Sequence, residues 1–190
     1  MAILGIFWRR WFLASLALLL AAGSEGAAQT APSREYQIKA VFLFNFAQFV
    51  DWPTQAFADA QAPLIIGVLG DDPFDGFLDE IVRGERINNR PLAVQRYRTV
   101  DEINQCQVLF ISRSETKNLA AIFARLRGRN ILTVGDGEAF TRHGGMIRFA
   151  TVNNKTRLKI NVAAAKAVEL TISSKLLRPA EIVTAGEIDR

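Results

Sequence analysis

Few residues of this sequence belong to the types that commonly carry catalysis or bind metals. Among 190 residues His143 is the only histidine and Cys106 the only cysteine. One histidine cannot form a histidine metal cluster, and one cysteine cannot form an internal disulfide. No serine lies in a Gly-x-Ser-x-Gly elbow. A hydrolase would depend on His143 alone, so the sequence favours a binding or regulatory domain without a cofactor over an enzyme.

Polar side chains follow three apolar, strand-like runs. Asp71 and Asp72 follow the run at 64–70, Arg113 follows 106–111, and Asp136 follows 131–134. In an open α/β sheet the carboxyl ends of parallel strands meet at one edge, where ligands often bind. We therefore expect Asp71, Asp72, Arg113 and Asp136 to line a crevice. A periplasmic sensor of a small ligand is the second interpretation of the sequence.

The elements that position these side chains alternate between strands and helices. Strands are expected at 64–70, 91–97, 106–111 and 131–134, with helices at 73–82 and 114–126. Two alternating runs flank Asn153 and Asn154, which is typical of a hairpin. A last helix is expected at 163–177. The pattern predicts an α/β fold with a mostly parallel central sheet, helices on both faces, a C-terminal antiparallel hairpin and a terminal helix.

An aromatic-rich run at 35–53 predicts the opening helix. Apolar residues occupy most of its circumference, which indicates a buried helix. Ser33 is expected to cap it and Pro53 to end it. Lys39 and the short apolar length argue against a membrane span, which needs roughly 20 apolar residues. Its surplus apolar surface predicts a dimer or partner interface at this helix.

The first 28 residues have the features of a cleaved signal peptide. Arg9 and Arg10 precede an uncharged Leu/Ala-rich stretch at 11–22, and Gly26 and Ala28 offer a cleavage site. A retained N-terminal anchor is the alternative. We expect a periplasmic domain at 29–183 and a loose tail at 184–190.

Charge gives no indication of nucleic-acid binding. The chain carries 23 Lys and Arg against 19 Asp and Glu, a formal net charge of +4 that is scattered along the sequence. Its one dense basic cluster, Arg125, Arg127 and Arg129, is interpreted as the solvated end of a helix, where cations are favourable.

The hairpin is the candidate partner-binding surface. Met146, Phe149 and Leu158 alternate with basic residues in its two strands. The alternative is that the apolar set packs on the sheet, as in most half-buried hairpins. The full set of candidate partner-binding residues is Met146, Arg148, Phe149, Arg157, Leu158 and Glu169.

Seven segments in order along the chain point to a family. They are EYQIKAVFLFNFAQFVDWP (35–53), IGVLGDDPF (66–74), CQVLFIS (106–112), LTVGD (132–136), GGMI (144–147), INVAAA (160–165) and ISSKLL (172–177). Together the sequence resembles the YfiR-like family of periplasmic regulators over about residues 34–183.

The resemblance implies a function and partners. It implies a homodimer that binds and represses the periplasmic sensory domain of an inner-membrane diguanylate cyclase, lowering cyclic di-GMP and biofilm formation. It also implies a second partner, an outer-membrane lipoprotein with a peptidoglycan-binding domain. Family members use disulfides, which Cys106 alone cannot form within the chain. Redox control through internal disulfides is therefore not expected here. Cys106 is expected to be a buried thiol, and the alternative is an intermolecular disulfide if it is exposed.

Overall fold

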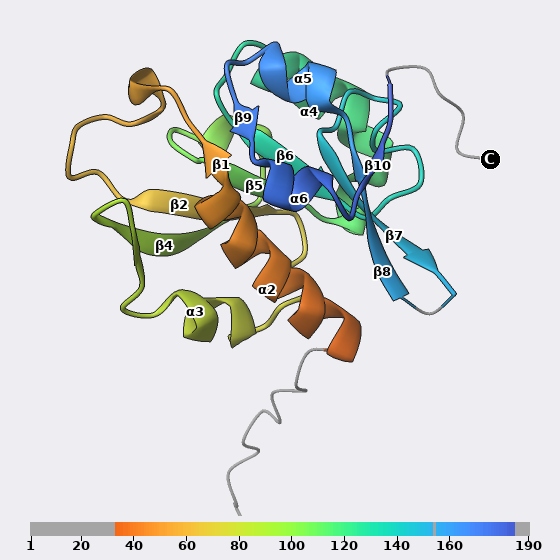
Figure 1. Ribbon diagram of the computed structural model, residues 1–190, viewed down its shortest axis with the longest axis horizontal. Coiled ribbons are helices and arrows are strands. Elements are labelled where there is room, and N and C mark those ends of the chain that lie inside the picture. Colours follow the sequence, from red (N-terminus) through yellow and green to blue (C-terminus); the bar gives the residue numbers. More distant parts are fainter. Residues whose placement is uncertain (1–32, 154, 185–190) are drawn as a thin grey trace, which may run out of the picture. The chain divides into compact units, whose positions relative to one another are not determined.

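The computed structural model describes residues 33–153 and 155–184, all within one compact unit, Ala31–Arg190 (Figure 1). The predicted signal peptide and most of the predicted tail lie outside the described residues. No helix in 33–153 and 155–184 combines the length and the apolar character needed to cross a membrane.

A mixed eight-stranded sheet forms the centre of this unit. Its order is β10-β8-β7-β6-β5-β2-β4-β3. The strands are β2 (Leu64–Leu69), β3 (Arg86–Ile87), β4 (Arg90–Tyr97), β5 (Val108–Ile111), β6 (Leu132–Gly135), β7 (Ile147–Val152), β8 (Lys155–Ile160) and β10 (Glu181–Ile182). Parallel pairing runs from β4 through β2, β5 and β6 to β7, whereas β7–β8 and β3–β4 are antiparallel. The mostly parallel sheet and the hairpin are as predicted.

Helices cover both faces of the sheet, which also confirms the prediction. One face packs against α2 (Arg34–Phe49), α3 (Phe77–Val82), α5 (Val162–Lys166) and α6 (Ser174–Leu177) in the larger hydrophobic cluster. The other face packs against α4 (Leu119–Leu126), which follows the 3₁₀ turn η3 (Arg113–Asn118). Two further 3₁₀ turns are η1 (Thr54–Ala56) and η2 (Val100–Glu102). Strand β2 lies between these layers, and all six of its residues are buried.

The opening helix differs from its prediction at both ends. The Ser33 side chain makes no cap hydrogen bond, and its carbonyl instead accepts from the backbone N–H groups of Tyr36 and Gln37. The helix stops at Phe49, before Pro53, because β1 (Val50–Asp51) pairs with β9 (Thr171–Ile172) in a small antiparallel sheet.

The predicted terminal helix at 163–177 was wrong as a continuous element. It is divided into α5, β9 and α6. Glu169 has a positive φ of 60°, and Leu170 donates its backbone N–H to the carbonyl of Ala165. This turn closes α5 and buries Leu170, so that the next residues can pair with β1. The alanine-rich sequence favours helix, but these tertiary contacts prevail.

The helix predicted at 73–82 is shorter than expected. Asp72 Oδ1 accepts the backbone N–H of Phe74 at 2.7 Å, and Asp75 has a positive φ of 48°. The chain therefore makes an Asx turn first, and α3 begins only at Phe77. The helix predicted at 114–126 likewise begins as the 3₁₀ turn η3 before α4.

Candidate functional site

A buried ion pair joins α2 to the carboxyl end of β6. The side chains of Lys39 and Asp136 are each 1% exposed, and Lys39 Nζ lies 2.5 Å from Asp136 Oδ2. Glu35 Oε1 lies 2.6 Å from the same nitrogen, one turn earlier on the helix. A lysine this deeply buried requires such partners, because an unpaired charge in a protein interior is strongly unfavourable.

Two further side chains complete this ion-pair cluster. The Tyr36 hydroxyl donates to Asp136 Oδ2 at 3.1 Å, and Arg113 Nε lies 3.2 Å from Oδ1. Burial, followed by the charge of Asp136 and its hydrogen bond, raises the pKa of Tyr36 to about 12. Tyr36 therefore remains a neutral donor at physiological pH. Lys39 and Tyr36 of α2 thus share Asp136 Oδ2, and the cluster ties α2 to the carboxyl end of β6.

The structure brings two of the four predicted crevice residues together. Arg113 and Asp136 meet at the carboxyl ends of β5 and β6, as expected for neighbouring parallel strands. Asp72 instead pairs with Arg96, whose Nε lies 2.7 Å from Asp72 Oδ2. Asp71 is exposed and donates its backbone N–H to Ser114 Oγ at 3.0 Å.

The loop after β2 is tightly packed against η3. Gly70 has φ +86°, and a Cβ at this position would lie 2.4 Å from Ser114 Oγ and 2.9 Å from Glu115 Cγ. Only glycine fits this approach without rearrangement. The strand ends are thus occupied by protein side chains, chiefly Lys39, which the sequence interpretation missed.

The apolar residues of the predicted hairpin surface lie in the core. Met146, Phe149 and Leu158 are between 3% and 6% exposed. Phe149 stacks on Phe46 of α2 with ring centroids 5.9 Å apart. This placement agrees with the alternative in which the apolar set packs on the sheet.

The polar residues of the predicted partner-binding set differ in their solvent exposure. Arg148 is buried at 9% exposure, whereas Arg157 and Glu169 are exposed. Glu169 Oε2 accepts a hydrogen bond from Gln55 Nε2 at 2.5 Å. No contiguous hairpin patch is therefore formed by these residues.

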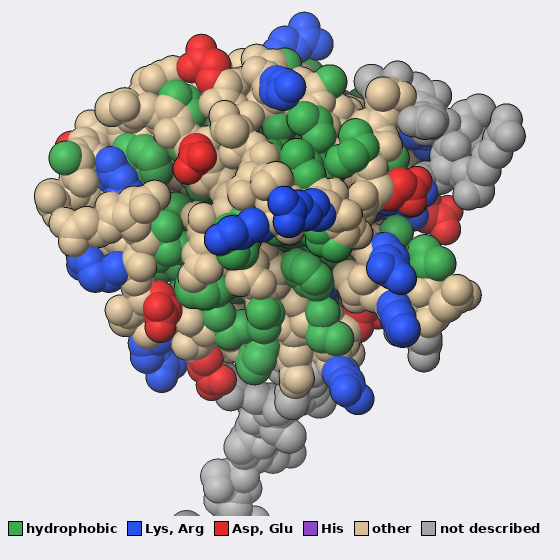
Figure 2. All heavy atoms as spheres, in the orientation of Figure 1, with side chains coloured by type: hydrophobic (Ala, Val, Ile, Leu, Met, Phe, Trp, Pro, Cys, Tyr) green, Lys and Arg blue, Asp and Glu red, His purple; other side chains and the backbone are tan. Residues whose placement is uncertain are grey.

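The outer face of α2 carries apolar side chains toward solvent. Ile38 and Val41 are 42% and 45% exposed, and Val152 at the hairpin end of β7 is 47% exposed. A groove of about 570 Å³ between α2 and the hairpin is lined by Ile38, half-buried Phe42 and polar residues including Glu35. We call Ile38, Val41, Phe42 and Val152 the α2 surface. Figure 2 shows hydrophobic side chains gathered along the course of α2 on this side of the molecule.

The residues with catalytic potential are isolated. His143 is exposed, and its Nδ1 lies 2.8 Å from the carbonyl oxygen of Ala139. Cys106 is buried, and burial raises the pKa of its thiol to about 12, so it is an inert thiol at neutral pH. The described residues contain no group of three or more His, Cys, Asp or Glu arranged to hold a metal ion.

These features define an α/β domain with a buried ion pair at the end of β6 and with apolar side chains exposed on α2. Over residues 36–181 the sequence matches the family described as YfiR/HmsC-like, and the chain belongs to that family. The resemblance given by the seven segments is thereby confirmed. The family is one of periplasmic regulators rather than of enzymes.

Other comparisons add little. No curated protein matches the sequence. Among solved structures, an ABC domain in complex with L-Trp from Streptococcus pneumonia is similar at 10% identity with a TM-score of 0.45. The match covers 63% of this chain and 55% of that one, so the chain spans about half the length of the solved protein.

Proposed function

We propose that this protein represses an inner-membrane diguanylate cyclase by binding its periplasmic sensory domain, and so lowers cyclic di-GMP and biofilm formation. Membership of the YfiR/HmsC-like family supports the regulatory role. The single structural observation that carries the proposal is the α2 surface, because Ile38 and Val41 expose apolar side chains that the domain does not bury itself.

The α2 surface has the composition of a protein interface. Its apolar centre is bordered by polar and charged residues, among them Arg34, Glu35 and Lys155. Interfaces commonly combine an apolar centre with a polar rim, and a few central residues carry most of the affinity. Residues of α2 are also held in place by the ion-pair cluster, so the surface is formed before the partner arrives.

Repression then follows from differential binding. The regulator binds the inactive conformation of the sensory domain more tightly than the active one and shifts the population toward it. A change from mostly active to mostly inactive requires a difference of about 5 kcal/mol in binding free energy. Burying two or three apolar side chains in the complex with the inactive conformation but not in that with the active one, at roughly 1.5–3 kcal/mol each, would supply such a difference.

Dimer formation and a second partner belong to the same proposal. In this proposal the homodimer is the repressing form, and an outer-membrane peptidoglycan-binding lipoprotein would bind the same apolar surface in competition with the cyclase. Competition of this kind would release repression without any change in the regulator's fold.

The test is genetic, with matched surface variants. Deletion of the gene should raise cellular cyclic di-GMP, and the wild-type gene should restore the low level. Val41→Asp should fail to restore it, while Ala121→Asp, on the exposed side of α4, should restore it fully. Both variants should retain the wild-type melting temperature within about 2 °C, because exposed substitutions change stability little.

Two outcomes would contradict the proposal. An unchanged cyclic di-GMP level after deletion would reject repression of a cyclase. Full repression by Val41→Asp would reject the α2 surface as the contact. A small-ligand sensor is the second candidate function, and a cavity on the other side of the domain favours it.

A further inference from the structure

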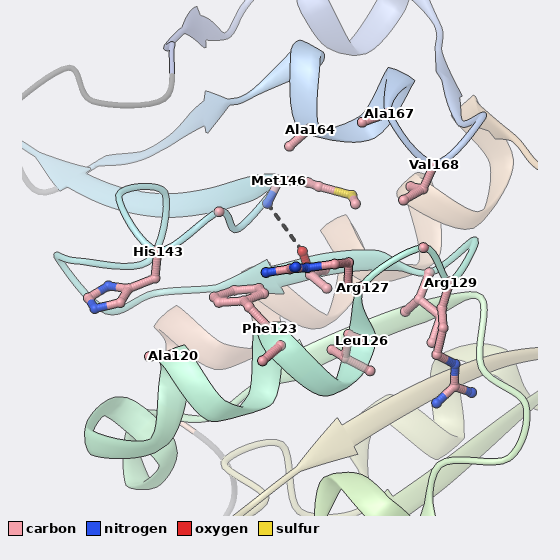
Figure 3. Close-up of a pocket in the computed structure, with 15 residues that line it drawn as sticks. Ala120, Phe123, Leu126, Arg127, Arg129, His143, Met146, Ala164, Ala167 and Val168 are labelled. Carbon is pink, nitrogen blue, oxygen red and sulfur yellow. Dashed lines mark hydrogen bonds between the residues drawn. The ribbon is translucent and has the colours of Figure 1, made fainter.

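A cavity of about 580 Å³ opens where β6 and β7 separate. Strand β6 pairs with β5 along its whole length, but with β7 only at Val134 and Gly135. The loop that joins them returns at Met146, whose backbone N–H donates to Thr133 Oγ1 at 3.2 Å. The first half of β6 therefore lacks a strand on this side, and α4 and α5 face each other across the gap (Figure 3).

The walls of this α4–α5 cavity are apolar. Phe123 and Leu126 come from α4, and Met146 and Val168 line the opposite side. Alanines of α4 and α5, including Ala120 and Ala164, leave the space open because they have no side chain beyond Cβ. Its volume lies within the range of small-molecule sites, about 300–1,000 Å³.

The charge around this cavity is positive. Arg127 and Arg129 line it, and no Asp or Glu is found among its described lining residues. Figure 3 shows Arg127 extending across the opening between Phe123 and Met146.

The three arginines of the cluster at the end of α4 have different partners. Arg125 Nε lies 3.5 Å from Asp101 Oδ1, and Arg129 donates to the carbonyl of Asn104 at 2.9 Å. The side chain of Arg127 makes no ion pair or hydrogen bond with any residue of 33–153 or 155–184. A guanidinium with five donors that lies beside an apolar cavity suits a carboxylate, which it can bind through two parallel hydrogen bonds.

We propose that the α4–α5 cavity binds a small monocarboxylate with an apolar body, with Arg127 holding the carboxylate and the walls of the cavity enclosing the rest. The site is distinct from the α2 surface and does not rest on the proposed repression. Its ligand is an aliphatic or an aromatic acid, since both combine a single charge with an apolar body.

The test uses the purified protein, two candidate acids, acetate as a control and the neutral amide of each candidate acid. Isothermal titration should detect binding of decanoate or of 4-phenylbutyrate, and acetate should not bind. The preferred acid distinguishes an aliphatic from an aromatic ligand. The uncharged amide of each acid, 4-phenylbutyramide or decanamide, should bind at least tenfold more weakly than the acid itself.

Variants assign the binding to this cavity. Arg127→Gln should weaken acid binding at least tenfold, whereas the matched control Arg125→Gln should change it less than twofold. Ala164→Leu should fill the cavity and weaken acid and amide alike. Arg127 is exposed, so Arg127→Gln tests the proposal even if Ala164→Leu does not fold.

Three results would overturn the proposal. They are failure of both acids to bind, equal affinity for an acid and its amide, and unchanged affinity in Arg127→Gln.

Discussion

The helices α2 and α4 cover opposite faces of one sheet in very different ways. Helix α4 buries one stripe, including Leu119, Ile122 and Leu126, and turns alanines and Arg125 outward. Helix α2 buries Leu43 and Phe46 and also turns Ile38 and Val41 outward. One apolar stripe is enough to cover a sheet face, as α4 demonstrates. The additional apolar surface of α2 is therefore not explained by the packing of the described domain.

The two helices also differ in how they are anchored. The contacts of α4 with the sheet are apolar, whereas α2 adds the buried pair of Lys39 and Asp136. A buried ion pair contributes little net stability, but separating its partners leaves an unpaired buried charge, so the pair favours the helix position that keeps them together. We infer that the orientation of α2 matters more than that of α4, in agreement with a role for its outer face in binding.

The largest expected effect comes from breaking this anchor. Lys39→Met leaves Asp136 buried without its closest cation, which should lower the free energy of unfolding by about 3–5 kcal/mol in a urea titration. The control Lys117→Met, at an exposed position of η3, should stay within about 0.5 kcal/mol. A loss below about 1 kcal/mol for Lys39→Met would show that the pair does not anchor α2.

A smaller effect is expected where the inner and outer faces of α2 meet. Phe42 is half-buried, with its ring 5.8 Å from that of Phe149 and 6.1 Å from that of Phe46. Phe42→Asp should lower the free energy of unfolding by about 2–4 kcal/mol and abolish the proposed dimer, because it places a charge against these rings. Urea titration and light scattering measure the two effects. Phe42→Leu should remain dimeric, and a folded, dimeric Phe42→Asp variant would refute the prediction.

The smallest effect is expected at an exposed ion pair, which sharpens the contrast with the buried one. Arg96 Nη2 lies 2.5 Å from Asp79 Oδ2, and both side chains are 41% exposed. Solvent screens such pairs, so Arg96→Gln should cost at most about 1 kcal/mol at pH 7.

The pH dependence of this effect has a definite sign. The hydrogen bond from Arg96 lowers the pKa of Asp79 below its usual value. The stabilisation is therefore present above about pH 4, where the unfolded carboxyl is ionised, and is lost as the pH falls through the folded pKa. Urea titrations should show the difference between wild type and Arg96→Gln shrinking from pH 7 to pH 3. A difference that grows on acidification would contradict this assignment.

The sequence allowed much of the fold to be predicted, because the relevant signals are local. The continuous apolar run of β2 and the Asn-containing hairpin turn identify their elements directly. The division of the last helix was missed because it depends on pairing between β9 and β1, more than a hundred positions apart along the chain. Helical propensity in an alanine-rich segment contains no information about such a partner.

Only part of the candidate site could be predicted, again because local sequence patterns do not identify partners distant along the chain. Strand topology placed Arg113 and Asp136 together, but it could not reveal that Lys39, from a helix 97 residues away, occupies the space between the strand ends. The signal was a lysine within the buried stripe of an apolar helix. That position predicts a buried acidic partner, although not which one.

The rate at which the buried Cys106 thiol reacts with a labelling reagent reports how often the native structure opens locally. As the sole cysteine, with a pKa raised to about 12 by burial, it is shielded from thiol reagents while the native packing persists. Cys106 lies beside β2 and β5, so its labelling rate measures how often the structure opens around these two strands. Ligands or partners that stabilise this layer would slow the reaction, so their binding can be followed without introducing any probe.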